Sequence, residues 1–427
     1  MNIVIFEDSK FNNLYPISMT KPVWEIRSGC FTQRERIEKV IQDQYSNIRK
    51  INFFYLTRVE LVPLFKEKYP QLNINDYSFY DNGEDILFIN STVILTKDIS
   101  KIPKNTLVMY KEVPVIALIE PDRLKQKITD IPELMSRMKD IQQYQTDLFK
   151  NISYIWDLIK DNGSVISEDF TMIEGKKGDK INNSVTIIGE SSQLYIEDNV
   201  RIDPFVCIDL KGGPVIIRKG TVINSFSRIE GPCCIGQDCI VLGAKIRKGC
   251  SFGDYCRIGG EIEETIFHGY SNKYHDGFIG HSYIGEWVNI GALTTNSDLK
   301  NNYTDVKVFT PQSRISSNSI KVGCFMGDFT KTSIGTLINT GASIGPGAML
   351  VHSGTITPPH IPPFAWFINN RILDYGDILG FIKSCRAMTS RRGVDISNYY
   401  EDMLINLYET TNEMRKEEIL KWKKIQK

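Results

Sequence analysis

The sequence predicts an α/β domain, then a coil of short parallel strands, then a helical extension. Three observations predict this order. Only 3 of the 31 glycines precede residue 166, apolar residues recur at every sixth position after Val185, and the end of the chain has a helical pattern. A chain of 427 residues with 41% apolar and 24% charged residues has room for two or three globular domains. The predicted limits are 1–165, 166–357 and 358–427.

The first part alternates apolar runs with helical patterns, which is typical of a layered α/β domain with a mostly parallel sheet. The predicted strands are Ile3–Phe6, Ile51–Leu56, Ile86–Ile89 and Val113–Ile119. The predicted helices are Gln33–Tyr45, Val59–Lys68 and Leu124–Lys150.

The second part repeats with a period of six residues from about Val185 to Met349. Apolar residues keep this step over long stretches, and many are followed by glycine, as at Ile235, Ile258 and Ile284. An apolar residue at every sixth position predicts a narrow prism of short strands, with glycine at its sharp corners. Two stretches, Glu261–Phe278 and Leu299–Ser319, break the step, and we expect loops and sites there.

The proline-rich run Pro358–Pro363 is predicted to end the coil. Residues 373–427 then predict helices, with an amphipathic pattern around Tyr399–Leu420. The end of this extension carries an excess of Lys and Arg, and we interpret it as a solvated helical cap.

The composition limits the classes of binding partner and the cellular compartment that we expect for this protein. Lys+Arg and Asp+Glu are both 51, so the basic excess typical of nucleic-acid binding is absent. No apolar run approaches the ~20 residues of a membrane span, and Met1–Phe6 is typical of a first strand and not of a signal peptide. We therefore expect a cytoplasmic protein with reduced thiols. The 9 cysteines form no C-x-x-C pair, and we interpret them as small core residues and not as a zinc site.

The stretch from Gly269 to Asn296 carries the chemistry. It reads GYSNKYHDGFIGHSYIGEWVNIGALTTN, and its single most reactive candidate is His275, because imidazole exchanges a proton near neutral pH. His281, which follows a repeat glycine, is interpreted as structural. A metal site made of His268, His275 and His281 is disfavoured, because the coil would have to place all three on one face.

This stretch resembles the acetyltransferase half of the bifunctional N-acetylglucosamine-1-phosphate uridyltransferase/glucosamine-1-phosphate acetyltransferases. The resemblance implies a left-handed parallel β-helix. It also implies His275 as the catalytic base, with Asn296 beside the acetyl-transfer centre. Lys273 and Asn289 would bind the substrate, and Ala292 the acyl donor. Two departures, Phe278 in place of Tyr and Leu293 in place of Gly, point to a different substrate.

The start of the chain resembles the nucleotidyltransferase half of the same family, which implies a Rossmann-like fold. Phe6–Pro22 keeps Pro16, Lys21 and Pro22 of the phosphate-binding pattern but lacks its glycines. The family places a magnesium-binding Asp where the strand here ends at Asn90, and a neutral amide is a poorer ligand. Asp8 and Asp157 are the weak candidates to compensate.

Nearly the whole chain is similar to a divergent subgroup of predicted sugar nucleotidyltransferases. The similarity is carried by Tyr15–Gly29, Gly269–Phe278, Leu299–Tyr303 and Arg386–Arg392. Lys21 and Arg27 are the candidates for contacting phosphate, because cations at a strand-to-helix junction can hold pyrophosphate oxygens. The alternatives are a surface Lys, and an Arg paired with Glu25 or Glu35.

Three functions stay open at this point. The first is a bifunctional transferase, with acetyl-CoA as acyl donor and Mg²⁺ for nucleotidyl transfer, working on a sugar phosphate or nucleotide sugar. The second is an acyltransferase whose first domain only binds a nucleotide sugar. The third is a non-enzymatic binding or scaffold protein. The resemblance also implies a homotrimer formed through the coil.

Overall fold

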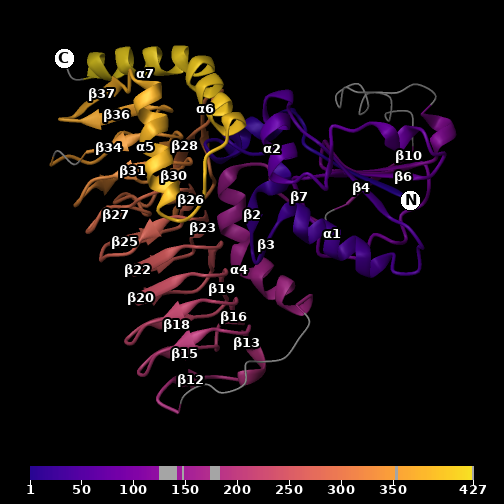
Figure 1. The fold of residues 1–427 in the computed structure, drawn as a ribbon, viewed down its shortest axis with the longest axis horizontal. Coiled ribbons are helices and arrows are strands. Elements are labelled where there is room, and N and C mark those ends of the chain that lie inside the picture. Colours follow the sequence, from indigo (N-terminus) through magenta and orange to yellow (C-terminus); the bar gives the residue numbers. More distant parts are fainter. Residues whose placement is uncertain (125–141, 147–148, 174–182, 352–353, 426–427) are drawn as a thin grey trace. The chain divides into compact units, whose positions relative to one another are not determined.

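The computed structural model describes residues 1–124, 142–146, 149–173, 183–351 and 354–425 (Figure 1). These residues form two compact units. The first unit comprises 1–12, 21–26 and 31–153, and the second comprises 13–20, 27–30 and 154–427. The first unit holds an α/β sheet, and the second holds the coil and the C-terminal helices. No helix among the described residues is long and apolar enough to cross a membrane.

The first unit is built on a seven-stranded mixed sheet. Its order is β10 (Gln142–Gln145), β8 (Thr106–Tyr110), β9 (Val113–Ile119), β6 (Ile86–Asn90), β1 (Asn2–Phe6), β4 (Asn52–Leu56) and β5 (Asn73–Ile74). Strands β6, β1, β4 and β5 are parallel, and β9 is antiparallel to both β6 and β8. All four predicted strands are confirmed. The sheet order turns at β1, which lies between β4 and β6. The carboxyl ends of β1 and β6 therefore mark the switch point at which ligands bind in open α/β sheets, and we call this region the crevice.

Helices accompany the parallel strands as predicted. Helix α1 (Gln33–Gln44) begins at a capping box, in which Thr32 and Glu35 bond each other's backbone N–H groups. Helix α2 (Val62–Lys68) follows a short 3-10 turn. The predicted helix Leu124–Lys150 lies largely outside the described residues. Its described part differs from the prediction, because Gln142–Gln145 forms strand β10 at the edge of the sheet and Lys150–Asn151 forms strand β11 beside β7 (Val93–Ile94).

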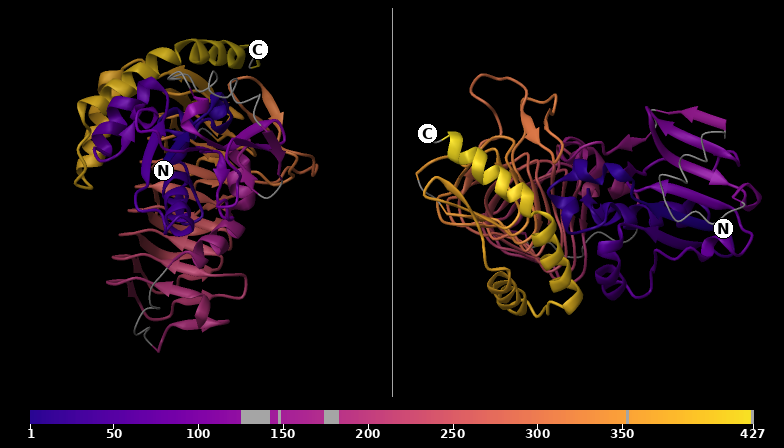
Figure 2. Two further views of the ribbon diagram at one scale, coloured as in Figure 1. Left: turned by 90° about the vertical axis from the view of Figure 1, so that its right-hand side faces the viewer. Right: turned by 90° about the horizontal axis from the view of Figure 1, so that it is seen from above.

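The second unit contains a parallel β-helix, as the six-residue period predicts. Ile217 pairs with Ile235 of the next rung, which is three steps of the period further along the chain. Strands of successive rungs stack in register, and the view from above shows the rungs one over another (Figure 2). One face consists of β13 (Leu194–Ile196), β16 (Val215–Ile217), β19 (Cys233–Ile235), β21 (Cys250–Phe252), β23 (Ile266–Gly269), β26 (Tyr283–Glu286), β30 (Phe325–Met326), β33 (Ser343–Ile344) and β35 (His360–Ile361).

The remaining strands of the coil form its other faces. One sheet contains β12 (Thr186–Ile188), β15 (Cys207–Asp209), β18 (Arg228–Glu230), β20 (Ile240–Ile246), β17 (Val222–Ile223), β14 (Arg201–Ile202), β22 (Arg257–Glu263), β24 (Asn272–Lys273) and β25 (Phe278–Gly280). Shorter sheets pair β27 (Thr295–Asn296) with β32 (Leu337–Ile338), and β31 (Lys331–Thr332) with β34 (Met349–Leu350), β36 (Ala365–Ile368) and β37 (Arg371–Asp374).

One predicted interruption of the coil is wrong and the other is confirmed. Glu261–Phe278 stays within the coil, because Phe252 pairs with Phe267 and this rung is only slightly shorter than three steps of the period. The later pairing of Ile284 with Met326 encloses a much longer stretch of chain. This longer stretch contains the antiparallel hairpin of β28 (Lys307–Phe309) and β29 (Arg314–Ser316), so the expected loop lies there.

The prism core is a column of small and branched apolar residues. Ile235, Ile258 and Ile284 are fully buried in it. All nine cysteines are free, and Cys233, Cys239, Cys250, Cys256 and Cys324 belong to this core. The interpretation of the cysteines as small inward-facing residues is therefore confirmed for these five, whereas Cys207 and Cys234 of the coil lie outside the prism core.

Helices cover the side and the end of the coil. Helix α4 (Ile155–Thr171) includes residue 165, the predicted domain boundary, and its Asn162 bonds the Gly249 carbonyl and the Ser251 hydroxyl. The Pro358–Pro363 run does not end the coil, because β35 and β36 add a further rung. Helices α5 (Ile378–Ser390), α6 (Asn398–Thr410) and α7 (Asn412–Ile425) follow as predicted. Trp422 of α7 packs on the core, which closes that end of the prism.

Candidate functional sites

The crevice of the first unit contains the predicted metal candidate Asp8. Asn90, at the end of β6, donates from Nδ2 to Oδ2 of Asp8 at 2.9 Å, and the Asn90 side-chain carbonyl accepts from the backbone and hydroxyl of Thr92. The Asn90 oxygen is therefore already occupied. Asp8 keeps one half-buried carboxylate at the mouth of the crevice, and a single carboxylate together with substrate phosphates is a common magnesium site. Asp8 thus fits the ion.

Asp157 has a different role. It lies in the second unit, at the third position of helix α4, and its carboxylate accepts the Tyr154 backbone N–H at 2.9 Å. This contact is the capping arrangement expected of an acidic residue in a first helical turn. Among the described residues, no group of three or more His, Cys, Asp or Glu side chains could hold a metal ion.

The sequence did not predict a buried ion pair in the crevice, which is formed by Glu7 and Arg58. Glu7 is 4% exposed and accepts hydrogen bonds from the Val23 N–H, the Thr57 hydroxyl and the Arg58 N–H. Arg58 also forms an ion pair with Glu7 at 3.2 Å, and its guanidinium lies over the Phe11 ring. The available signal was a charged residue soon after each of two neighbouring apolar strands.

The two predicted phosphate contacts fall in different units. Lys21 belongs to the first unit and is only 2% exposed, and its carbonyl accepts from Arg58 at 3.1 Å. Arg27 belongs to the second unit, where its guanidinium donates to the Cys30 carbonyl at 3.0 Å and its backbone exchanges hydrogen bonds with the Tyr283 hydroxyl. Glu25 pairs with Arg34 at 2.6 Å. Phosphate binding by Lys21 and Arg27 stays a prediction.

His275 stands at an exposed turn of the coil between β24 and β25. Tyr274 lies edge-on to its ring, with the centroids 5.8 Å apart. No hydrogen bond to the imidazole nitrogens of His275 occurs among the described residues, which leaves both nitrogens accessible. An imidazole on a surface turn is free to accept a proton from a bound substrate.

The side chain of Lys273 anchors this turn through hydrogen bonds to backbone carbonyls. Lys273 is 1% exposed, and its ammonium group donates to the carbonyl of Gly259 at 3.2 Å and to the carbonyl of His275. Burial lowers the pKa of Lys273 to about 8, and Asp276 opposes this shift. Lys273 therefore fixes the backbone that carries His275, and its amine is occupied by the protein.

A groove of 370 Å³ lies beside this turn and is lined by Gly260, Asp276, Gly277, Phe278 and Thr295, among others. Gly260 has φ +68°, and a Cβ there would lie 2.7 Å from both the Lys273 ammonium and the Gly277 carbonyl. Only glycine satisfies this backbone and this approach. Phe278, the departure from Tyr, thus lines the groove beside His275.

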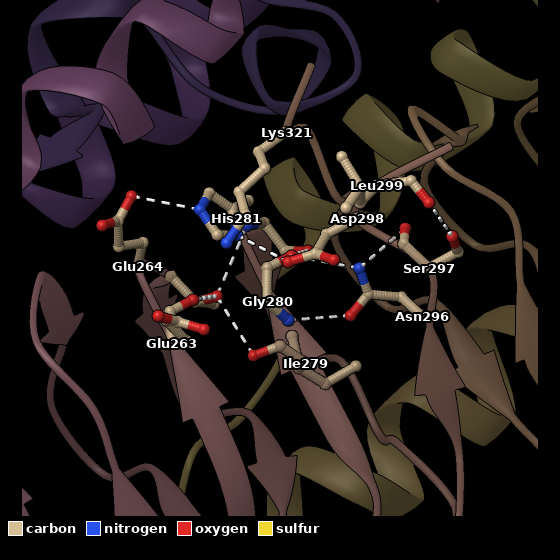
Figure 3. A network of polar contacts seen from close by, with 12 residues as sticks. Glu263, Glu264, Ile279, Gly280, His281, Asn296, Ser297, Asp298, Leu299 and Lys321 are labelled. Atoms are coloured by element: carbon tan, nitrogen blue, oxygen red, sulfur yellow. Dashed lines mark hydrogen bonds and ion pairs between the residues drawn. The ribbon is translucent and has the colours of Figure 1, made fainter. Parts of the chain in front are cut away.

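The side chain of Asn296 forms hydrogen bonds with backbone groups. Its Oδ1 accepts from the Gly280 N–H at 2.8 Å, and its Nδ2 donates to the Gly280 and Ser297 carbonyls (Figure 3). The side chain thereby bridges two rungs. The structure brings Lys273 and His275 together, and Asn296 lies on the next rung and bonds back to Gly280, on the rung that carries His275. The role of Asn296 in acyl transfer stays a prediction.

His281 is the centre of an ionic cluster next to Asn296. Its Nδ1 lies 2.7 Å from Asp298 and its Nε2 lies 3.2 Å from Glu264, as Figure 3 shows. Burial disfavours the imidazolium, but the two carboxylates outweigh it and raise the pKa of His281 to about 9. A histidine that stays protonated at neutral pH cannot act as a base, which agrees with the structural interpretation.

Asn289 and Ala292 lie on the rung that follows the His275 turn, and the Leu293 N–H of that rung donates to the Asp276 carbonyl at 2.7 Å. Asn289 accepts at Oδ1 from Nδ2 of Asn272 at 3.1 Å and pairs in register with Lys331. The half-buried Ala292 accepts at its carbonyl from the Gly335 N–H at 2.8 Å. The next residue, Leu293, is 60% exposed and has φ 61°, so it projects from the corner where the family has glycine.

Comparison with known proteins agrees with the motifs. Residues 3–177 match a family model described as sugar nucleotidyl transferase. A bifunctional sugar-1-phosphate nucleotidylyltransferase/acetyltransferase of Sulfurisphaera tokodaii is 34% identical over 36% of this chain and 39% of its own length. The bifunctional protein GlmU of Xylella fastidiosa is 29% identical over 41% of this chain and 35% of its own length. The resemblance to bifunctional transferases of this kind is confirmed.

Other likenesses are more distant. The GlmU protein of Bartonella bacilliformis is 26% identical over 64% of this chain and 56% of its own. Among solved structures, an Arabidopsis UDP-N-acetylglucosamine acyltransferase matches with a TM-score of 0.26 and 14% identity, over 54% of this chain and 90% of its own. The matched regions span little more than a third of the first two relatives named above, at 35% and 39% of their lengths.

Proposed function

We propose that the chain is a bifunctional-type transferase whose coil transfers an acyl group from a CoA thioester, with acetyl-CoA as the donor. The observation that carries the proposal is the exposed His275 imidazole, fixed from below by the buried Lys273 beside a groove. The names of the relatives, which pair nucleotidyl transfer with acetyl transfer, support this choice of chemistry.

In the proposed acyl transfer, His275 removes a proton from an amine or hydroxyl of a sugar phosphate or nucleotide sugar. The acceptor lone pair attacks the thioester carbonyl carbon, and the tetrahedral oxyanion is stabilised by backbone N–H groups of an adjacent rung. The carbon–sulfur bond then breaks, and the imidazolium returns its proton to the CoA thiolate. Asn289 would bind the substrate and Ala292 the acyl donor.

In the first unit, we propose nucleotidyl transfer at the carboxyl ends of β1 and β6. An oxygen of a sugar 1-phosphate attacks the α-phosphorus of a nucleoside triphosphate, the bond to the β-phosphate breaks, and pyrophosphate leaves. Lys21, in this unit, would contact phosphate, and phosphate binding by Arg27 is a separate proposal because Arg27 belongs to the second unit. Asp8 is the residue that would hold Mg²⁺, an ion that neutralises phosphate charge when it is bound.

A second candidate is an acyltransferase whose first unit only binds a nucleotide sugar. The specific observation in its favour is Asn90, whose amide occupies the place of a carboxylate and whose oxygen is taken by Thr92. A third candidate, a scaffold without activity, is disfavoured by the accessible imidazole of His275.

We further propose that the protein is a cytoplasmic homotrimer assembled through the coil. Phe205 and Phe226 stack on each other at a coil corner and are 66% and 77% exposed, and Leu293 and Ile334 are also exposed. Apolar side chains gathered in this way are typical of interfaces. The free cysteines agree with a reducing compartment.

The test uses the purified full-length protein with acetyl-CoA and a panel of amino sugar phosphates and nucleotide sugars, measuring release of free CoA thiol. Replacing His275 with Ala should lower the rate about 10²- to 10⁴-fold, whereas Tyr274→Phe, a matched neighbour, should retain activity. Unchanged turnover in the His275→Ala variant would remove the imidazole from the mechanism. Pyrophosphate release from nucleoside triphosphates with sugar 1-phosphates separates the first candidate from the second.

A further inference from the structure

A second cavity of 370 Å³ lies on the coil beside the end of helix α5, apart from the His275 groove. Its lining combines three cations, Lys331, Arg391 and Arg392, with Asn272 and Asn289 from the coil. None of the described residues that line it is acidic. Two segments with informative sequence motifs, Gly269–Asn296 and Arg386–Arg392, meet at this cavity, and their proximity is a result of the fold.

One cation of this cavity, Arg392, bonds to neutral groups. Arg392 donates to the Tyr255 carbonyl at 3.0 Å and to Oδ1 of Asn272 at 2.7 Å. Within the described part of the chain, Lys331, Arg391 and Arg392 form no ion pair. Burial, reinforced by the nearby charges of Arg257 and Arg391, lowers the pKa of Arg392. Gathering like charges in this way costs free energy, which an anionic ligand would recover.

One wall of the cavity is aromatic. Trp287 is 6% exposed and stacks on Tyr270 at 4.4 Å, and Tyr270 stacks in turn on Tyr255 at 4.8 Å. The Arg392–Asn272–Asn289 chain of hydrogen bonds connects this wall to the cationic side. The amide N–H groups of the Asn289 side chain have no partner among the described residues, so they are available as donors.

We propose that this cavity binds the diphosphate group of a nucleotide. Three cations match a ligand with more charge than a single phosphate, and bidentate Arg contacts suit phosphate oxygens. The volume exceeds what one phosphate fills and lies in the range of small-ligand sites. Tyr270 and Trp287 are stacked on both faces within the protein, so the wall is rigid and offers its ring edges to a ligand. Two sources of this diphosphate are compatible with the proposed function, namely the nucleotide end of a CoA thioester and a nucleotide sugar.

The binding test measures heats of binding by calorimetry on the full-length protein, with UDP, ADP, CoA and inorganic phosphate as probes. We expect at least one diphosphate to bind more tightly than inorganic phosphate, and its affinity to fall as the salt concentration rises. A preference for CoA over ADP and UDP identifies the acyl donor as the source, and a preference for UDP identifies a nucleotide sugar. If no diphosphate binds more tightly than inorganic phosphate, the proposal is overturned.

Variants locate the binding. The double replacement Arg391→Gln and Arg392→Gln should weaken diphosphate binding about 10- to 100-fold, the loss expected for charge-assisted hydrogen bonds. Lys331→Gln, on a separate element, should weaken it in the same direction and guards against a helix that fails to fold. Lys383→Gln, which removes an exposed charge from the same helix, is the control and should bind like the wild type. Binding unchanged in both cavity variants would contradict the proposal.

The proposal rests on the proposed function only in naming the two sources. Diphosphate binding is measured without turnover, so the two can fail separately. In the His275→Ala variant, binding should persist while acyl transfer is lost. Binding lost equally in His275→Ala and in Arg391→Gln/Arg392→Gln would mean that the diphosphate occupies the His275 groove, and would overturn the separate site.

Discussion

The crevice of the first unit and the candidate sites on the coil differ in whether their charged side chains have an oppositely charged partner. In the crevice, the buried Glu7 carboxylate pairs with the Arg58 guanidinium at 3.2 Å. On the coil, His275 is accessible, and Arg391 and Arg392 have no ion pair among the described residues. Charges that neutralise each other stabilise a fold, whereas charges left without a counter-ion are available to a ligand. The difference places the most available chemistry on the coil.

The largest expected effect concerns the buried ion pair between Glu7 and Arg58 in the crevice. Replacing Arg58 with Met leaves the buried Glu7 carboxylate without its cation, which should lower the free energy of unfolding by about 3–5 kcal/mol. Chemical denaturation of wild type and variant measures the loss. The cation at Lys383, which is exposed on α5, serves as the control, and Lys383→Met should change stability by less than ~0.5 kcal/mol. Equal stability of the Arg58→Met variant would show that Glu7 is not the ionised partner.

The second prediction concerns the support of His275. Replacing Lys273 with Met removes the two hydrogen bonds that fix the turn, so acyl transfer should fall about 10²-fold through a misplaced base. Lys219→Met, an exposed lysine elsewhere on the coil, should not change the rate. Because Lys273 positions His275 and need not touch substrate, we expect kcat to fall with little change in KM. A change confined to KM would instead assign Lys273 to substrate binding.

The third prediction is a pH dependence of stability. The pKa of His281 is raised from its usual 6.5 to about 9, so the imidazolium stabilises the fold fully below pH ~6.5 and this contribution is lost as pH rises through 9. We expect His281→Gln to cost roughly 2 kcal/mol at pH 6, after allowance for solvent screening. The gap to the wild type, measured by denaturation at several pH values, should close toward pH 9.5. A gap that stays constant would show that His281 is neutral.

The smallest expected effect tests whether a second carboxylate in the crevice allows it to bind Mg²⁺. Replacing Asn90 with Asp places a second carboxylate beside Asp8, which should destabilise the unit by about 1 kcal/mol through like-charge repulsion. Mg²⁺ should restore that stability in a thermal shift assay. Asn47→Asp adds the same charge at an exposed position and should show no magnesium effect. If Mg²⁺ fails to stabilise Asn90→Asp, Asp8 does not face an ion site.

The sequence alone determined the coil, because a six-residue period of apolar residues can be recognised without knowing any long-range contact. The same holds for the strand–helix alternation before it, whereas the catalytic role of His275 stays a prediction. The sequence misplaced one interruption, since the short rung between Phe252 and Phe267 breaks the period without leaving the coil. It also placed the end of the coil one rung early, at a proline run that the last strands tolerate.

Only the tertiary structure decided which charges meet. The resemblance assigns Lys273 to substrate binding, yet the fold buries its side chain and bonds its ammonium group to the His275 carbonyl. Arg392 and Asn272 are 120 residues apart and lie within hydrogen-bond distance, and Asp8 and Asp157 belong to different compact units. Pairing and burial depend on contacts that close long stretches of chain, and local patterns carry no record of them. The register of the rungs and the docking of α5 supplied that information.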